Sequence, residues 1–162
     1  MKFIEAAGAR VVPILTEESD EYYEKVYNCI NGLLLPGGGQ SLATSSYAKL
    51  ATKFMAWSRK TSENGGYFPI WGTCLGFEQM IFSTVYPALE VDSSSEHVIN
   101  ECIGCTGTGT VLHKSDDWDR SYLIQSLPKR MIRKIMNGNV CAYNWHKKCI
   151  KKSFMKHPSL SG

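Results

Sequence analysis

Two short apolar segments of the sequence end in glycines: GLLLPGGG, from Gly32 to Gly39, and YFPIWGTCLG, from Tyr67 to Gly76. Each follows an amphipathic pattern that predicts a helix, EESDEYYEKVYNCI in the first case and residues from about 42 to 60 in the second. Strands that alternate with helices at this spacing form a parallel sheet covered by helices on both faces. We therefore predict a three-layer α/β/α domain with a mainly parallel sheet.

Glycines and hydroxyl side chains set the expected boundaries in the first part of the chain. The segment KFIEAA is predicted to be a helix that ends at Gly8, where a left-handed conformation is available. The segment NGG, from Asn64 to Gly66, is expected to end the helix over residues from about 42 to 60. The β-branched segment RVVPIL then favours a strand, and Thr16 or Ser19 is expected to cap the helix that follows it.

The pattern is less regular after Tyr86, where short strand-like and turn segments are followed by a predicted helix at LPKRMIRKIM and a strand at NVCAYNWH. We assign residues 1–162 to a single domain. Because the chain opens on a helix with no strand before it and ends soon after NVCAYNWH, we expect a domain that is incomplete at both ends.

Composition is that of one globular domain, with 162 residues, 43% hydrophobic content and a net charge of +3. Most of the positive charge lies in HKKCIKKSFMKH, which is read as a solvated basic segment. No window approaches the ~20 apolar residues of a membrane-spanning helix. The start is not read as a secretory signal, because Glu5 and Arg10 interrupt its apolar residues.

The segment Gly72-Thr73-Cys74-Leu75-Gly76 has the G-x-nucleophile-x-G form of a nucleophile elbow, in which a sharp strand-to-helix turn presents the reactive side chain. The flanking glycines lack Cβ atoms and let neighbouring backbone pass close to the turn. The positive end of the helix macrodipole favours the thiolate. Cys74 is therefore predicted to be a nucleophile, and a structural thiol is the alternative.

An oxyanion that forms on a substrate carbonyl needs hydrogen-bond donors. The Leu75 amide, at the start of the helix, is the first predicted donor. The glycines after LLLP supply further free N–H groups at the end of the adjacent strand, and Gly37 and Gly38 are the predicted donors there.

The segments YFPIWGTCLGFE, AAGARVVPI, INGLLLPGGG and SSYAKLA closely resemble γ-glutamyl hydrolase, the folate poly-γ-glutamate-cleaving family of the class I glutamine amidotransferase-like superfamily. The resemblance is dense over residues 2–80 and patchy over residues 81–162. It implies that Cys74 attacks the γ-glutamyl isopeptide carbonyl and forms a thioester that water later hydrolyses. It also implies that His146, in NWHK, and Glu78 contact the substrate; for Glu78, a capping or packing carboxylate is an equally good interpretation.

The resemblance implies a small-molecule partner, a poly-γ-glutamyl folate. No nucleic-acid or membrane partner is expected, and a homodimer is the assembly considered. No cofactor and no metal are predicted. Family members are secreted or held in lysosomes or vacuoles, and the same localisation is expected here.

One feature of the family is missing from the sequence, namely the late W-H-P-E segment that supplies its general base. His157, in KHPS, imitates only the centre of that segment and is read as a surface histidine. His146 is a second candidate if it reaches Cys74. A catalytically dead relative that binds a γ-glutamyl ligand or a partner protein is therefore the alternative function.

Two further patterns have structural explanations that we favour. Cys102-Ile-Gly-Cys105 has the C-x-x-C spacing of a zinc knuckle or a redox pair, but no second C-x-x-C accompanies it, so two unpaired thiols are expected. Trp71 and Trp145 could wall a pocket for a flat aromatic group, although packing is the favoured role.

Overall fold

The computed structural model describes residues 2–87, 99–101, 106–110, 116–137, 142–146, 148–151 and 153–160. The chain divides into two compact units, of which the first comprises residues 1–99 and 150–162 and the second residues 100–149. The assignment of the whole chain to a single domain stays a prediction.

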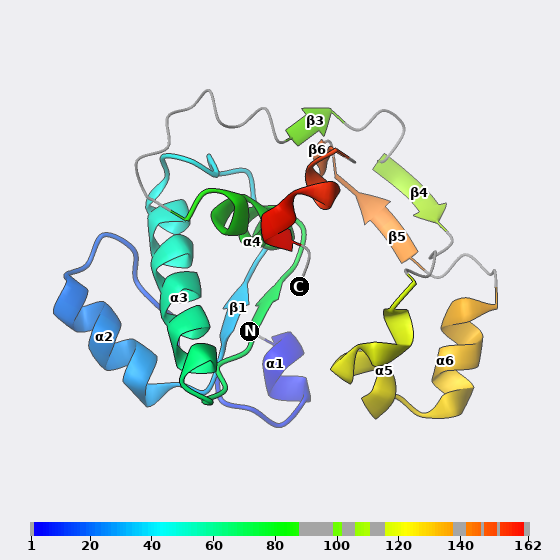
Figure 1. Ribbon diagram of the computed structural model, residues 1–162, viewed down its shortest axis with the longest axis horizontal. Coiled ribbons are helices and arrows are strands. Elements are labelled where there is room, and N and C mark those ends of the chain that lie inside the picture. Colours follow the sequence, from blue (N-terminus) through cyan, green and yellow to red (C-terminus); the bar gives the residue numbers. More distant parts are fainter. Residues whose placement is uncertain are drawn as a thin grey trace. The chain divides into compact units, whose positions relative to one another are not determined.

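The first unit is an α/β structure, as predicted. Its elements are α1 (Lys2–Ala6), α2 (Asp20–Cys29), β1 (Leu33–Leu35), α3 (Ser46–Glu63), β2 (Ile70–Gly72) and α4 (Leu75–Val85). The strands β1 and β2 are parallel, with Leu33 opposite Ile70 and Leu35 opposite Gly72. They lie side by side between α1 and α4 in Figure 1, and α4 packs against both strands and against α3.

The capping residues account for the helix boundaries in this unit. The Ser19 hydroxyl accepts a hydrogen bond from the Tyr22 N–H and caps α2, which confirms one of the two predicted caps. Gly8, after α1, and Gly65, after α3, have φ angles of 87° and 77°, which glycine adopts without steric cost. The predicted ends of both helices are therefore confirmed.

The strand predicted for RVVPIL is wrong, because residues 10–15 are neither helix nor strand. Pro13 has no N–H to donate to a neighbouring strand. The side chains of Val12 and Leu15 are 59% and 57% exposed, so this β-branched segment does not pack as a buried strand would. High β-propensity alone does not make a strand when no partner strand is available.

The third helix begins at Ser46, about four residues later than the prediction. Two serines explain the delay. The Ser41 hydroxyl accepts hydrogen bonds from the N–H groups of Ala43 and Thr44 and closes a turn before the helix. The Ser45 hydroxyl then accepts a hydrogen bond from the Ala48 N–H and caps α3.

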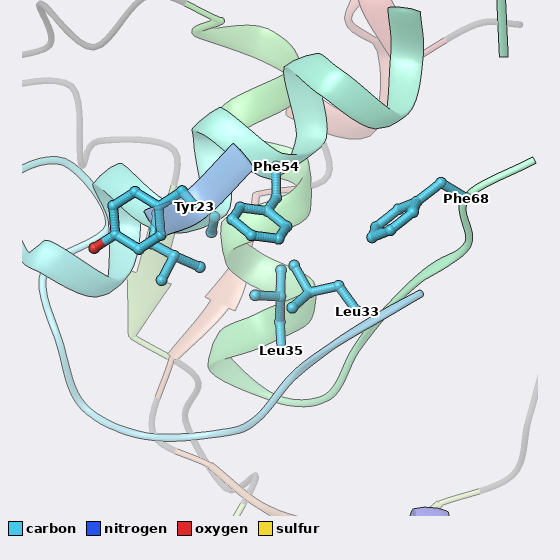
Figure 2. Packing of buried hydrophobic residues seen from close by; sticks show 7 residues of the cluster. Tyr23, Leu33, Leu35, Phe54 and Phe68 are labelled. Carbon is cyan, nitrogen blue, oxygen red and sulfur yellow. The ribbon is translucent and has the colours of Figure 1, made fainter. Parts of the chain in front are cut away.

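The main core lies where α2, α3 and the two strands meet. Figure 2 shows the Phe54 ring over Leu33 and Leu35, with Tyr23 on one side of it and Phe68 on the other. Phe54 is fully buried and contacts Tyr23 edge to face, with 6.3 Å between the ring centroids. This packing holds β1, whose carboxyl end leads into the glycine-rich loop.

A second buried cluster lies beside the start of α4. It comprises Leu42, Ala43, Leu75 and Phe82, with Ile150 and Phe154 packed against it. A buried polar network reinforces the cluster, because the Gln79 amide donates to the Leu42 carbonyl at 3.2 Å and to the Ser83 hydroxyl at 3.0 Å. The network joins the loop after β1 to α4.

The second unit contains most of the remaining elements, although Ile99 of β3 and Ile150 of β6 belong to the first unit. These are β3 (Ile99–Glu101), β4 (Thr106–Thr110), a 3-10 turn (Trp118–Arg120), α5 (Tyr122–Ser126), α6 (Lys129–Met136), β5 (Ala142–Trp145) and β6 (Lys148–Ile150). The helix and strand predicted around residues 127–136 and 139–146 correspond to α6 and β5, and β5 pairs antiparallel with β4. Cys102 and Cys105, the C-x-x-C pair, lie outside the described residues.

Two further 3-10 turns, Phe154–Lys156 and Pro158–Leu160, follow β6 and belong to the first unit. Among the helices that the structure describes, none is long and apolar enough to cross a membrane.

Candidate active site

Cys74 lies in the sharp turn between β2 and α4 and has an unusual backbone conformation. Its φ angle is 55° and its ψ angle is −118°, and among the described non-glycine residues only Glu17 shares a positive φ. Such a conformation costs ~1–3 kcal/mol and persists only where the surrounding structure enforces it. The side chain is exposed, and the N–H groups of the first turn of α4 follow directly. These are the features of a strained turn that presents one side chain to solvent.

The two glycines that flank this turn are required by close packing. A Cβ atom on Gly76 would lie 2.1 Å from the Leu35 carbonyl oxygen, and one on Gly72 would lie 2.5 Å from the Gly76 carbonyl group. The Thr73 N–H also donates a hydrogen bond to the Leu35 carbonyl at 3.0 Å. The close backbone approach predicted from the glycine spacing is therefore present, and it holds the turn against β1.

The glycine-rich loop after β1 lies beside Cys74. A Cβ atom on Gly37 would lie 3.1 Å from the Cys74 Cβ and 3.6 Å from its Sγ, and one on Gly38 would lie 3.4 Å from the Leu75 side chain. Within the described part of the chain, the N–H groups of Gly37, Gly38 and Leu75 donate no hydrogen bond. Unpaired backbone donors close to a thiol are what an oxyanion hole requires.

Tyr47, in the first turn of α3, also lies near Cys74, and sequence reasoning assigned it no role. Its hydroxyl donates a hydrogen bond to the Pro36 carbonyl at 3.0 Å. Burial, and to a smaller extent the negative charge of the nearby Cys74 thiolate, raise the pKa of Tyr47 to about 12. The tyrosine occurs in SSYAKLA, which begins six residues after Gly39, and this proximity in sequence was the signal available.

Aromatic side chains flank the turn on both sides in sequence. Trp71, on β2, is 48% exposed and donates a hydrogen bond from its indole N–H to the Thr73 hydroxyl at 3.1 Å. Phe77, in α4, is 46% exposed. Trp71 is therefore not the buried packing residue that the sequence analysis favours. About half of its surface is exposed, three positions before Cys74 in the chain.

Glu78 is buried in the first turn of α4, and its N–H donates to the Cys74 carbonyl at 3.1 Å. Burial suits a packing carboxylate, and contact with substrate stays a prediction. His146 directly follows β5 in the second unit and is partly buried, and its role also stays a prediction.

His157 lies between the two C-terminal 3-10 turns and is partly buried, rather than a freely exposed surface residue. Its Nδ1 accepts a hydrogen bond from the Ser159 N–H at 3.2 Å. Among the described residues, no three histidine, cysteine or acidic side chains come together in a way that could hold a metal ion.

A sequence model of the Peptidase C26 family matches residues 1–157. The chain is 37% identical to rat gamma-glutamyl hydrolase over 164 residues, which cover 99% of this chain and 47% of the relative. It is 36% identical to mouse gamma-glutamyl hydrolase, with the same coverage, and 34% identical to the human enzyme of that name over 91% of this chain and 43% of the relative.

These matches show that the chain belongs to the Peptidase C26 family, whose members include proteins named gamma-glutamyl hydrolase. The family resemblance predicted from the sequence is confirmed. The chain spans about half the length of the curated relatives that it matches.

Proposed function

We propose that the protein is a cysteine-dependent hydrolase that cleaves the γ-glutamyl isopeptide bonds of folate poly-γ-glutamates through a thioester acyl-enzyme. The observation that carries the proposal is the exposed thiol of Cys74, held at a positive φ directly before α4 and beside the glycine-rich loop. The names of the rat and mouse relatives support the γ-glutamyl bond as the target.

The first chemical step is attack of the Cys74 thiolate on the carbonyl carbon of the γ-glutamyl bond. A C–S bond forms, and the π electron pair of the carbonyl moves to its oxygen. The N–H groups of Gly37 and Leu75 stabilise that oxyanion, with Gly38 as a further donor. The tetrahedral intermediate then collapses, the C–N bond breaks, and the leaving nitrogen takes up the proton that the thiol gave up.

The second step hydrolyses the thioester. Water adds to the thioester carbonyl, the same donors stabilise the second oxyanion, and the C–S bond breaks to return the thiolate and a free γ-carboxylate. Both steps need a group that accepts a proton and returns it. Such general acid–base catalysis raises the rate of comparable reactions ~10²–10⁴-fold. His146 and Glu78 are the proposed substrate contacts.

The substrate consists of a flat aromatic pterin with a chain of acidic residues. The exposed ring faces of Trp71 and Phe77 near Cys74 support binding of an aromatic group.

The test is incubation of the 162-residue chain with pteroyl di-γ-glutamate and measurement of released glutamate by mass spectrometry. We expect release by the native chain and by Cys29→Ala, which removes another exposed thiol, and none by Cys74→Ala. Release by Cys74→Ala at the native rate contradicts the cysteine mechanism. If the native chain retains the ligand uncut, the protein is a binder instead.

A further inference from the structure

The glycine-rich loop beside Cys74 is joined to α3 by one side-chain hydrogen bond. The Tyr47 hydroxyl donates to the carbonyl of Pro36, the residue directly before Gly37. The Tyr47 ring packs against both buried clusters of the first unit, so the hydroxyl is held by a fixed side chain.

This hydrogen bond acts on the peptide unit that contains the Gly37 N–H. Every described peptide bond is trans, and in a trans peptide the carbonyl and the following N–H point in opposite directions. Fixing the Pro36 carbonyl therefore fixes the direction of the Gly37 N–H. Three successive glycines have no side chains that could hold the loop, so an external anchor is needed for a defined geometry.

The geometry points to Tyr47 as a positioning residue that holds the Pro36–Gly37 peptide so that the Gly37 N–H can stabilise the oxyanion formed when Cys74 attacks a carbonyl. The inference rests on the proposed function. The hydroxyl remains a donor throughout the neutral range, because the pKa of Tyr47 is raised to about 12. Tyr47 acts through Gly37 and takes no part in bond making.

Two reactions at the same sulfur separate this role from a general structural one. Iodoacetamide alkylates a thiolate by displacing iodide and creates no oxyanion. A γ-glutamyl p-nitrophenyl ester acylates the thiolate: a C–S bond forms, charge develops on the carbonyl oxygen, and p-nitrophenolate leaves without needing a proton. Only the second reaction depends on the oxyanion donors.

We expect Tyr47→Phe to slow acylation of Cys74 roughly 10-fold, which is less than the ~10²–10³-fold cost of removing an oxyanion donor itself. Alkylation of Cys74 is expected to keep its native rate. The matched control is Tyr27→Phe, which also removes one hydroxyl hydrogen bond, the one between the Tyr27 and Thr61 hydroxyls at 2.8 Å, and should change neither rate.

Three outcomes count against the inference. Native acylation by Tyr47→Phe overturns it, and so does an equal loss of acylation and alkylation, which indicates a structural role. Failure of the native chain to be acylated at Cys74 overturns the proposed function and this inference together.

If Tyr47→Phe does not fold, 3,5-difluorotyrosine at position 47 keeps the ring and the hydroxyl but ionises at lower pH. The ratio of acylation to alkylation should then fall as the fluorinated hydroxyl loses its proton, over a pH range in which the native ratio is constant. A constant ratio in both proteins overturns the inference.

Discussion

Cys74 and Cys29 are both exposed thiols, but they lie at opposite ends of helices. Cys74 directly precedes α4, whereas Cys29 is the last residue of α2. A helix stabilises a negative charge at its N-terminus and destabilises one at its C-terminus, by ~0.3–1 kcal/mol at each exposed end. The two thiols therefore lie in helix-end fields of opposite sign.

We expect iodoacetamide, in limiting amount at neutral pH, to label Cys74 roughly 10-fold faster than Cys29, since the two helix-end effects add. Peptide mass spectrometry measures both rates in one sample. High salt should narrow the ratio, because exposed charges are screened. Equal rates at low salt would remove the main support for an activated nucleophile.

At the scale of elements, the approach of α4 to β1 depends on one missing methyl group. A Cβ at Gly76 would lie 2.1 Å from the Leu35 carbonyl oxygen, which is backbone and cannot swing aside. We expect Gly76→Ala to lower the free energy of unfolding by ~1–3 kcal/mol, as overpacking does elsewhere, and to slow alkylation of Cys74. Urea denaturation measures the first effect.

Gly39→Ala is the matched control, because a Cβ at that loop position has no atom within 4 Å. It should change stability little. Similar stability of the two variants would mean that α4 can move away from β1 without cost.

The elements that sequence patterns predicted correctly are those fixed by local chemistry. Ser19 caps α2 through its own neighbour Tyr22, and Gly65 ends α3 through its own backbone angle. The RVVPIL strand was wrong because a strand depends on a partner that the local sequence does not specify. The strand β6 was not predicted for the same reason, and the helix α5, with five residues, is too short to show a periodic pattern.

The features of the candidate site also divide into those that the local sequence predicts and those that depend on contacts between distant residues. The G-x-C-x-G spacing predicts the turn at Cys74 and the close contacts of its glycines. The position of Gly37 and Gly38 at the end of the adjacent strand likewise predicts their place beside Cys74. The Tyr47 hydrogen bond joins residues 11 positions apart through a helix start and a loop, and no periodic pattern encodes it. Nor does a pattern reveal that Trp71 is half exposed.

At the scale of the whole molecule, the main core belongs to the first of the two compact units. The main core contains buried residues of α2, β1 and α3 together with Phe68, all of them in the first unit. The site residues Cys74, Gly37, Gly38, Leu75 and Tyr47 lie in that unit as well. Stability of the candidate site should therefore follow the stability of this core.

Phe54→Ala tests this dependence, because Phe54 is fully buried at the centre of the main core. Truncation of a buried phenylalanine costs ~3–5 kcal/mol, so amide hydrogen exchange should rise across α2 and α3. In the Phe54→Ala variant, exchange in the second-unit segment from Tyr122 to Met136 should stay as in the native chain. The control variant is Met131→Ala, at an exposed position of that segment, which should leave amide exchange in the first unit unchanged. Mass spectrometry of exchanged peptides measures both segments together. An equal rise in both would mean that the chain unfolds as one cooperative structure, and the core of the first unit would then support the second unit as well as Cys74.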